Sequence, residues 1–187
     1  PEIIHSHICV RSLVLSVHEQ RESFTKLISS SLDKNLLELS DNIIHYCIKN
    51  DNCIEYQFLK CQYLWKIGKT SKAISKLSNI VNENNDEKFI YLLAKWYYTK
   101  GSLQQARESM ELINSENIEF CYQWATINFS LYQSQKDIIY LKSSLIGYIK
   151  TLQKDPTNLI SSLRILHILF YCEDEIFDLF ESNYKSR

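Results

Sequence analysis

The chain has 187 residues, and its 21 lysine and arginine side chains nearly balance its 22 aspartate and glutamate side chains. This balance excludes the broad positive surface of a nucleic-acid-binding protein, and no apolar run reaches the ~18 residues that a transmembrane segment needs. Glycine and proline dominate tight turns, and only three glycines and two prolines occur, so the composition favours an all-α fold.

The first stretch, V-R-S-L-V-L-S-V-H-E at 10–19, predicts a boundary between two helices. Ser16 and Glu19 fit the S-x-x-E capping box, in which each side chain accepts a hydrogen bond from the backbone amide of the other. One helix should therefore end near Leu15 and another should begin after Ser16. A zinc-peptidase helix would need H-E-x-x-H, and the residues after His18-Glu19 do not supply the second histidine.

A repeat is visible in the middle of the chain when residues 57–77 are laid over residues 90–110. Every position is offset by 33, and the matched pairs are Phe58 and Tyr91, Cys61 and Ala94, Gly68 and Gly101, Ala73 and Ala106, and Leu77 and Met110. This period is typical of tetratricopeptide helix pairs, which bury their apolar faces by stacking. We expect each glycine to follow a helix end with positive φ, and Thr70 and Ser102 to cap the next helices.

Helical periodicity continues along the chain with short breaks. The predicted ranges are 19–31, 36–49, 54–67, 71–81, 88–100, 103–113, 118–133, 138–152, 156–171 and 175–184, with Asp155 as a cap before Pro156. No linker is long enough to separate two domains. We therefore predict one all-α tetratricopeptide/HEAT-like solenoid of antiparallel helix pairs over 1–187, with the clearest repeats at 54–81 and 88–113 and HEAT-like helices toward 138–187.

Lysines gather on one predicted helix and its preceding turn. No acidic residue lies between Glu55 and Glu83, and the spacing of Lys69, Lys72 and Lys76 places them on one helical face, with Lys66 one turn earlier. This positive patch could bind an anion, although a solvated basic face explains it equally simply.

Three segments, in order, resemble the FAT region of target-of-rapamycin (TOR) kinases, which belong to the phosphatidylinositol-3-kinase-related protein kinases (PIKK). The segment at 10–19 is similar to the family's V-R-S-L-V-x-S-x-H-E. F-C-Y-Q-W-A-T-I-N-F at 120–129 and S-L-R-I-L-H-I-L-F at 162–170 resemble two later motifs of that region. One tryptophan of each of these two motifs is replaced here.

The resemblance implies a regulatory scaffold that clamps a serine/threonine kinase domain. The expected partners are that kinase domain, the remaining repeats of a parent chain and TOR-complex subunits, in the cytoplasm or at endomembranes. The family can bind inositol hexakisphosphate in a lysine-rich pocket. Lys66 matches one lysine of that pocket, while Asn42 stands at the position of a second. The candidate residues for inositol hexakisphosphate or another anion are therefore the patch Lys66, Lys69, Lys72 and Lys76. The chain also opens at Pro1 without an initiator methionine, so we expect a piece of a longer protein.

Motifs of an enzyme are missing from the sequence. None of the kinase motifs occurs, and serine, histidine and acidic residues form no nucleophile motif. The six cysteines lack a C-x-x-C pair and follow no secretory segment, so we expect reduced, mostly buried thiols. A cysteine–histidine pair that meets only in space stays open. We predict no catalytic, cofactor-binding or metal residues, and the alternative function is a free-standing tetratricopeptide adaptor that binds a peptide or partner helix.

Aromatic residues are numerous in the same helices. Their helical spacing favours core packing over a ligand groove. The residues in question are Trp65, Trp96, Trp124, Tyr97, Tyr98, Tyr122 and Phe129.

Overall fold

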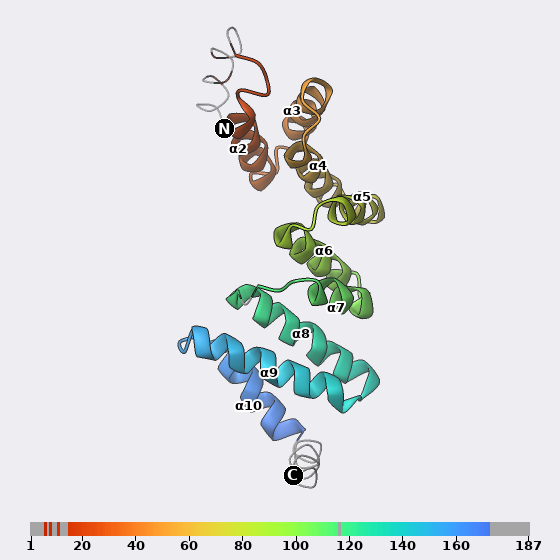
Figure 1. Ribbon diagram of the computed structural model, residues 1–187, viewed down its shortest axis with the longest axis vertical. Coiled ribbons are helices and arrows are strands. Elements are labelled where there is room, and N and C mark those ends of the chain that lie inside the picture. The colour runs from red at the N-terminus through yellow and green to blue at the C-terminus, as the bar shows by residue number, and fades with distance from the viewer. Residues whose placement is uncertain (1–5, 7, 9–10, 12–14, 116, 173–187) are drawn as a thin grey trace. The chain divides into compact units, whose positions relative to one another are not determined.

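The computed structural model describes residues 6, 8, 11, 15–115 and 117–172, and this part of the chain contains nine α-helices and no strand (Figure 1). The helices are α2 Arg21–Asp33, α3 Leu37–Asn50, α4 Ile54–Lys66, α5 Thr70–Glu83, α6 Glu87–Thr99, α7 Leu103–Glu111, α8 Ile118–Gln135, α9 Ile138–Lys154 and α10 Leu159–Tyr171. Each lies within three residues of a predicted helix, so the all-α prediction is confirmed. The predicted helix at 175–184 lies outside the described residues, and so does most of the one predicted to end near Leu15.

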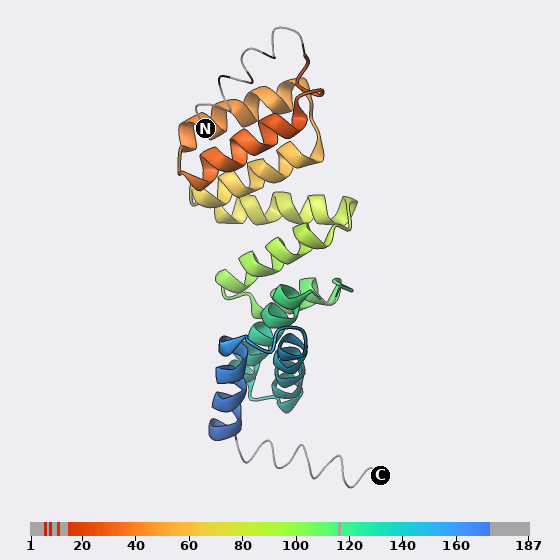
Figure 2. The same cartoon turned by 90° about the vertical axis from the view of Figure 1, so that its left-hand side faces the viewer.

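The chain groups into two compact units, residues 1–85 and residues 86–187. The expected organisation as one continuous repeat domain stays a prediction. In the first unit, α2, α3 and α4 lie side by side and α5 packs on α4 (Figure 2). Apolar residues recur along α2 at helical spacing, and they pack with Ile44, Cys47 and Tyr56 from α3 and α4 in one core.

In the second unit, α8 is the central helix and carries two apolar faces. Ile127 and Leu131 pack with the core of α6 and α7, while Ala125, Phe129 and Tyr132 pack with the core of α9 and α10. A helix that is apolar on two sides needs neighbours on both, which explains why α8 is buried between helix pairs.

Gly147 on α9 allows α8 and α9 to approach closely. A Cβ atom at this position would lie 2.8 Å from the Cβ of Ala125 and 3.0 Å from the carbonyl oxygen of Cys121. No real side chain tolerates such distances without a shift of the neighbouring helix, so the contact requires glycine.

The 33-residue spacing of helix ends is confirmed at both glycines. Gly68 and Gly101 have φ values of 79° and 78°. The amide after each glycine donates to the carbonyl five residues earlier, in bonds of 3.0 Å from Lys69 to Leu64 and 2.9 Å from Ser102 to Tyr97. This bond pattern is the Schellman motif, which satisfies the last carbonyls of a helix.

The structure adds two helix ends that the repeat alignment missed. Asn35, 33 residues before Gly68, has a φ of 58°, and the next amide, of Leu36, donates to the Ser31 carbonyl at 2.8 Å. Lys136, 35 residues after Gly101, also has a φ of 58° and ends α8. The sequence comparison did not reveal these two helix ends, because asparagine and lysine stand where the other two helix ends have glycine.

Two of the three predicted cap positions differ from the structure. Thr70 is the first residue of α5 rather than its cap. Ser102 holds the cap position of α7, as predicted, although its side chain makes no bond there. Asp155 ends α9, while the cap of α10 is Asn158, whose side chain accepts from the amide of Ser161 at 3.0 Å. Thr157 bonds the Asp155 side chain, so the turn after α9 is longer than the Asp-Pro pair suggests.

Candidate functional site

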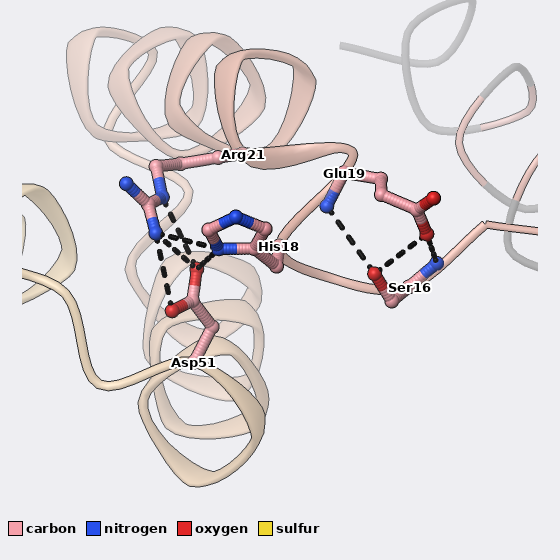
Figure 3. Close-up of polar contacts among 5 residues, drawn as sticks. All are labelled: Ser16, His18, Glu19, Arg21 and Asp51. Atoms are coloured by element: carbon pink, nitrogen blue, oxygen red, sulfur yellow. Dashed lines mark hydrogen bonds and ion pairs between the residues drawn. The ribbon is translucent and has the colours of Figure 1, made fainter.

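Two groups of polar contacts lie just before and at the start of α2 (Figure 3). Ser16 and Glu19 make the reciprocal bonds predicted for a capping box: the Ser16 amide donates to the Glu19 carboxylate at 2.7 Å, and the Glu19 amide donates to Ser16 Oγ at 3.3 Å. Helix α2 begins only at Arg21, so these bonds close the turn that precedes the helix. Hydrogen bonds from the Ser16 side chain and backbone hold the pKa of Glu19 below its usual value. Glu19 thus stabilises the turn before α2, which is a structural role.

His18 lies beside an ion pair that joins the start of α2 to the end of α3. Arg21 donates to both carboxylate oxygens of Asp51, at 3.1 and 3.3 Å, and the His18 Nδ1 is 3.7 Å from Asp51. The hydrogen bond to Asp51 raises the pKa of Arg21. In the described ranges, no three His, Cys, Asp or Glu side chains gather as metal ligands do. This cluster therefore joins the start of α2 to the end of α3.

The three described cysteine thiols of the first unit are poor nucleophiles. Burial raises the pKa of Cys47 to about 12 and that of Cys61 to about 11, and burial also raises the pKa of Cys53. A thiol must ionise to attack or to bind a metal, so these residues stay protonated at neutral pH. They act as small apolar residues in the core.

The four predicted anion-binding lysines are divided between two roles. Lys66, at the end of α4, donates to the carbonyl of Leu32 at 2.7 Å and so satisfies the last turn of α2. Lys69 precedes α5, and Lys72 and Lys76 are exposed along it. Lys72 and Lys76 are therefore exposed on α5, as their spacing predicts, whereas the ammonium group of Lys66 is bonded to α2.

A polar hollow of about 340 Å³ lies between α3, α4 and α5, and Lys76 lines it together with Lys60 and Glu83. Lys60 pairs with Asp41, and Glu83 adds a negative charge to the same hollow. The hollow therefore carries both signs of charge. Binding of inositol hexakisphosphate or another anion at Lys66, Lys69, Lys72 and Lys76 stays a prediction.

Replacing Lys66 tests its role at the end of α2. We expect Lys66→Ala to lower the free energy of unfolding by about 0.5–1 kcal/mol, because a cation that bonds the last carbonyls of a helix also favours the helix dipole. Lys69→Ala is the matched control, with an expected change within about 0.5 kcal/mol. Urea unfolding followed by circular dichroism measures both, and equal values would contradict the capping role.

The second unit contains a pocket of about 360 Å³ formed by α7, α8, α9 and the connection between α7 and α8. Its apolar lining comes from all three helices and their connection: Met110, Ile113, Phe120, Trp124 and Ile146. Glu111 and Lys150, both exposed, add one negative and one positive charge to this lining. An apolar lining with a few charged groups is the usual composition of a site that binds an organic group or a side chain.

Neighbouring contacts fix the walls of this pocket. The Glu87 carboxylate accepts from the amides of Asn114 and Ser115, at 3.2 and 3.0 Å, and so anchors the connection between α7 and α8. The Arg107 guanidinium lies 5.6 Å from the centre of the Trp124 ring and bonds Glu111 at 3.0 Å. The pocket is therefore held by side chains that are themselves fixed, as a binding site requires.

The aromatic residues divide between core and pocket. Trp96 and Phe129 are buried, as their helical spacing predicts. Trp124 is only half-buried and lines the pocket with Phe120. The sequence does not distinguish the core aromatic residues from the pocket aromatic residues, because both have the same helical spacing. Only the packing of the neighbouring helices decides which of them line the pocket.

No protein-family model matches the sequence, and no curated protein matches it. Similar solved structures are helical-repeat proteins. PilF of Pseudomonas aeruginosa is 9% identical, with a TM-score of 0.69 over 84% of this chain and 71% of that chain. MamA is 16% identical, with a TM-score of 0.64 over 84% of this chain and 92% of that chain. MamA of Desulfovibrio magneticus RS-1, from residue 41 to its end, is 16% identical, with a TM-score of 0.58 over 74% of this chain and 77% of that chain.

The chain has the fold of a tetratricopeptide-like helical solenoid. That part of the sequence interpretation is confirmed. Identities this low establish the fold alone. No helix in the described ranges is both long enough and apolar enough to cross a membrane.

The resemblance to a TOR FAT region is wrong, and so is the function of a kinase clamp that it implied. The similar structures are MamA and PilF, which are tetratricopeptide-type proteins, and no sequence-level match supports a TOR kinase. The three motifs have local explanations: Ser16 and Glu19 of the first form a capping box, and the other two are apolar patterns of α8 and α10. Stacked helix pairs produce such patterns in unrelated families. The expected kinase-domain and TOR-complex partners are likewise unsupported.

Proposed function

We propose that the chain is a non-catalytic tetratricopeptide adaptor that binds a peptide segment of a partner protein. The observation that carries this proposal is the pocket between α7, α8 and α9, with its apolar lining and two charged residues, on a fold built from helix pairs. Helical-repeat proteins commonly bind partners through surfaces that several consecutive helices form together.

The composition of the pocket suits one large apolar side chain of the peptide. Phe120 and Trp124 offer ring surfaces and Met110 offers an adaptable thioether, which together favour an aromatic or long aliphatic group. Glu111 and Lys150 add one charge of each sign beside this apolar lining, and Glu111 is itself held by Arg107. Recognition of one buried apolar anchor with a polar surround is the usual energetic design of a protein interface.

The compartment in this proposal is the cytoplasm, where thiols stay reduced. Among the described residues, Cys47, Cys53, Cys61 and Cys172 are free thiols, which supports this part of the proposal.

The experiment is a selection of peptides from a random library displayed on phage, followed by fluorescence anisotropy with the recovered peptide. Ile146→Glu should weaken binding by about tenfold or more, because an isoleucine contact contributes about 1.5–3 kcal/mol when fully buried. Ile149→Glu is the matched control: Ile149 lies on the same helix and both side chains are 46% exposed, but Ile149 does not line the pocket.

The control should change the affinity by less than about twofold, since a surface substitution away from the contact has little effect. Failure to recover any peptide, or an equal loss in both variants, would refute peptide binding in this pocket.

A further inference from the structure

Helix α10 is apolar on two opposite faces, and the described residues cover only one of them. Ser161 and Ile168 are fully buried, and Ile165 packs on the core of α8 and α9. The opposite face carries Leu159, Leu163, Leu166 and Phe170, which are 72%, 58%, 48% and 77% exposed. Their spacing of four, three and four residues makes a continuous apolar stripe along the helix.

A stripe of this kind is the normal contact surface for a neighbouring helix. Within each unit, every helix in the described chain packs against the helix that follows it. The central helix α8 shows the result, since both of its apolar faces are covered by neighbours. By this rule α10 requires a following helix, and a chain end that exposes the stripe would favour aggregation.

We propose that the stripe of α10 is covered by the chain's own segment 175–184, E-I-F-D-L-F-E-S-N-Y, which lies outside the described residues and whose sequence predicts a helix. Ile176, Phe177, Phe180 and Tyr184 fall on one side of that helix, while Asp178, Glu181 and Ser182 fall on the other. The segment therefore offers one apolar face to α10 and a polar face on its other side.

Connection length and capping support this occupant. Three residues, 172–174, separate α10 from the segment, the same number as between α2 and α3 or between α4 and α5. Asp174-Glu175 repeats the Asp86-Glu87 pair, in which the aspartate caps α6 by accepting from the amide of Lys88.

The lengths of the two elements also agree. Ten helical residues extend ~15 Å, and the stripe from Leu159 to Phe170 extends ~16 Å. The apolar match and the length therefore both favour this segment as the occupant.

The test uses hydrogen–deuterium exchange of the full chain and compares the amides of α10 in two variants. Phe177→Asp with Phe180→Asp places charges on the proposed contact face, and we expect the α10 amides to exchange at least about tenfold faster while α8 and α9 keep their protection. Asp178→Asn with Glu181→Gln changes the opposite face and should leave the exchange of α10 unchanged.

A dye that fluoresces on exposed apolar surface, anilinonaphthalene sulfonate, gives an independent reading. Its fluorescence should rise several-fold in the first variant only. Two results would overturn the proposal. One is equal exchange and dye binding in the wild type and the first variant. The other is protection of α10 that depends on protein concentration together with a dimer in light scattering, because a second copy of the chain would then be the occupant.

Discussion

Gly147→Ala lowers the free energy of unfolding of the chain by about 1–3 kcal/mol, because overpacking of a tight helix contact costs energy of this size. The added methyl group would lie 2.8 Å from the Ala125 Cβ and 3.0 Å from the Cys121 carbonyl, so α8 and α9 must separate. The sign of the effect is informative. In an uncrowded helix the same substitution would stabilise the protein by about 1 kcal/mol, since alanine has the higher helix propensity. Urea unfolding followed by circular dichroism measures the change.

A second substitution separates the steric effect from every other effect of the methyl group. Ala125→Gly removes the atom that the new methyl group meets, so the double variant Ala125→Gly with Gly147→Ala should be more stable than the sum of the two single changes predicts. Lys142→Ala, at an exposed position of α9, is the control and should change stability by less than about 0.5 kcal/mol. Additive single effects would show that the two helices are not in tight contact at Gly147.

Leu77→Ala should destabilise the chain by about 2–5 kcal/mol, the usual cost of a cavity at a fully buried leucine. Leu77 lies on α5 and has no exposed surface. The repeat supplies a matched control, because Met110 occupies the equivalent buried position 33 residues later. Leu77→Met should therefore cost less than about 1.5 kcal/mol, since it conserves the volume.

Thermal and urea unfolding of both variants test this prediction. Equal losses for alanine and methionine would mean that position 77 requires the shape of leucine, and the equivalence of the two repeats would then fail at this position.

The helices could be predicted because their cause is local. Apolar spacing of 3.6 residues and short polar breaks lie in the sequence itself, and all nine helices in the described part of the chain follow them. The turns after α4 and α6 were equally readable, because glycine is the residue that most easily takes a positive φ. The matching turns at Asn35 and Lys136 were missed, because asparagine and lysine indicate a positive φ less strongly than glycine does.

Short motifs were a poor guide to family and function. The segment 162–170 resembled a motif of the TOR FAT region, yet its residues belong to a largely apolar helix, one face of which packs on α8 and α9. A pattern of this kind indicates only that a residue packs against a neighbouring helix. It does not indicate the family or the function of the protein.

The sequence by itself determined the all-α class, the helix positions, the repeat of 33 residues and the capping box at Ser16. Tertiary structure alone decided which side chains meet. It brought Phe120, Trp124 and Ile146 to one pocket, engaged Lys66 with the carbonyl of Leu32 and placed Gly147 against Ala125. The physical reason is that a helix depends on residues three or four positions apart, whereas a pocket depends on how separate helices pack.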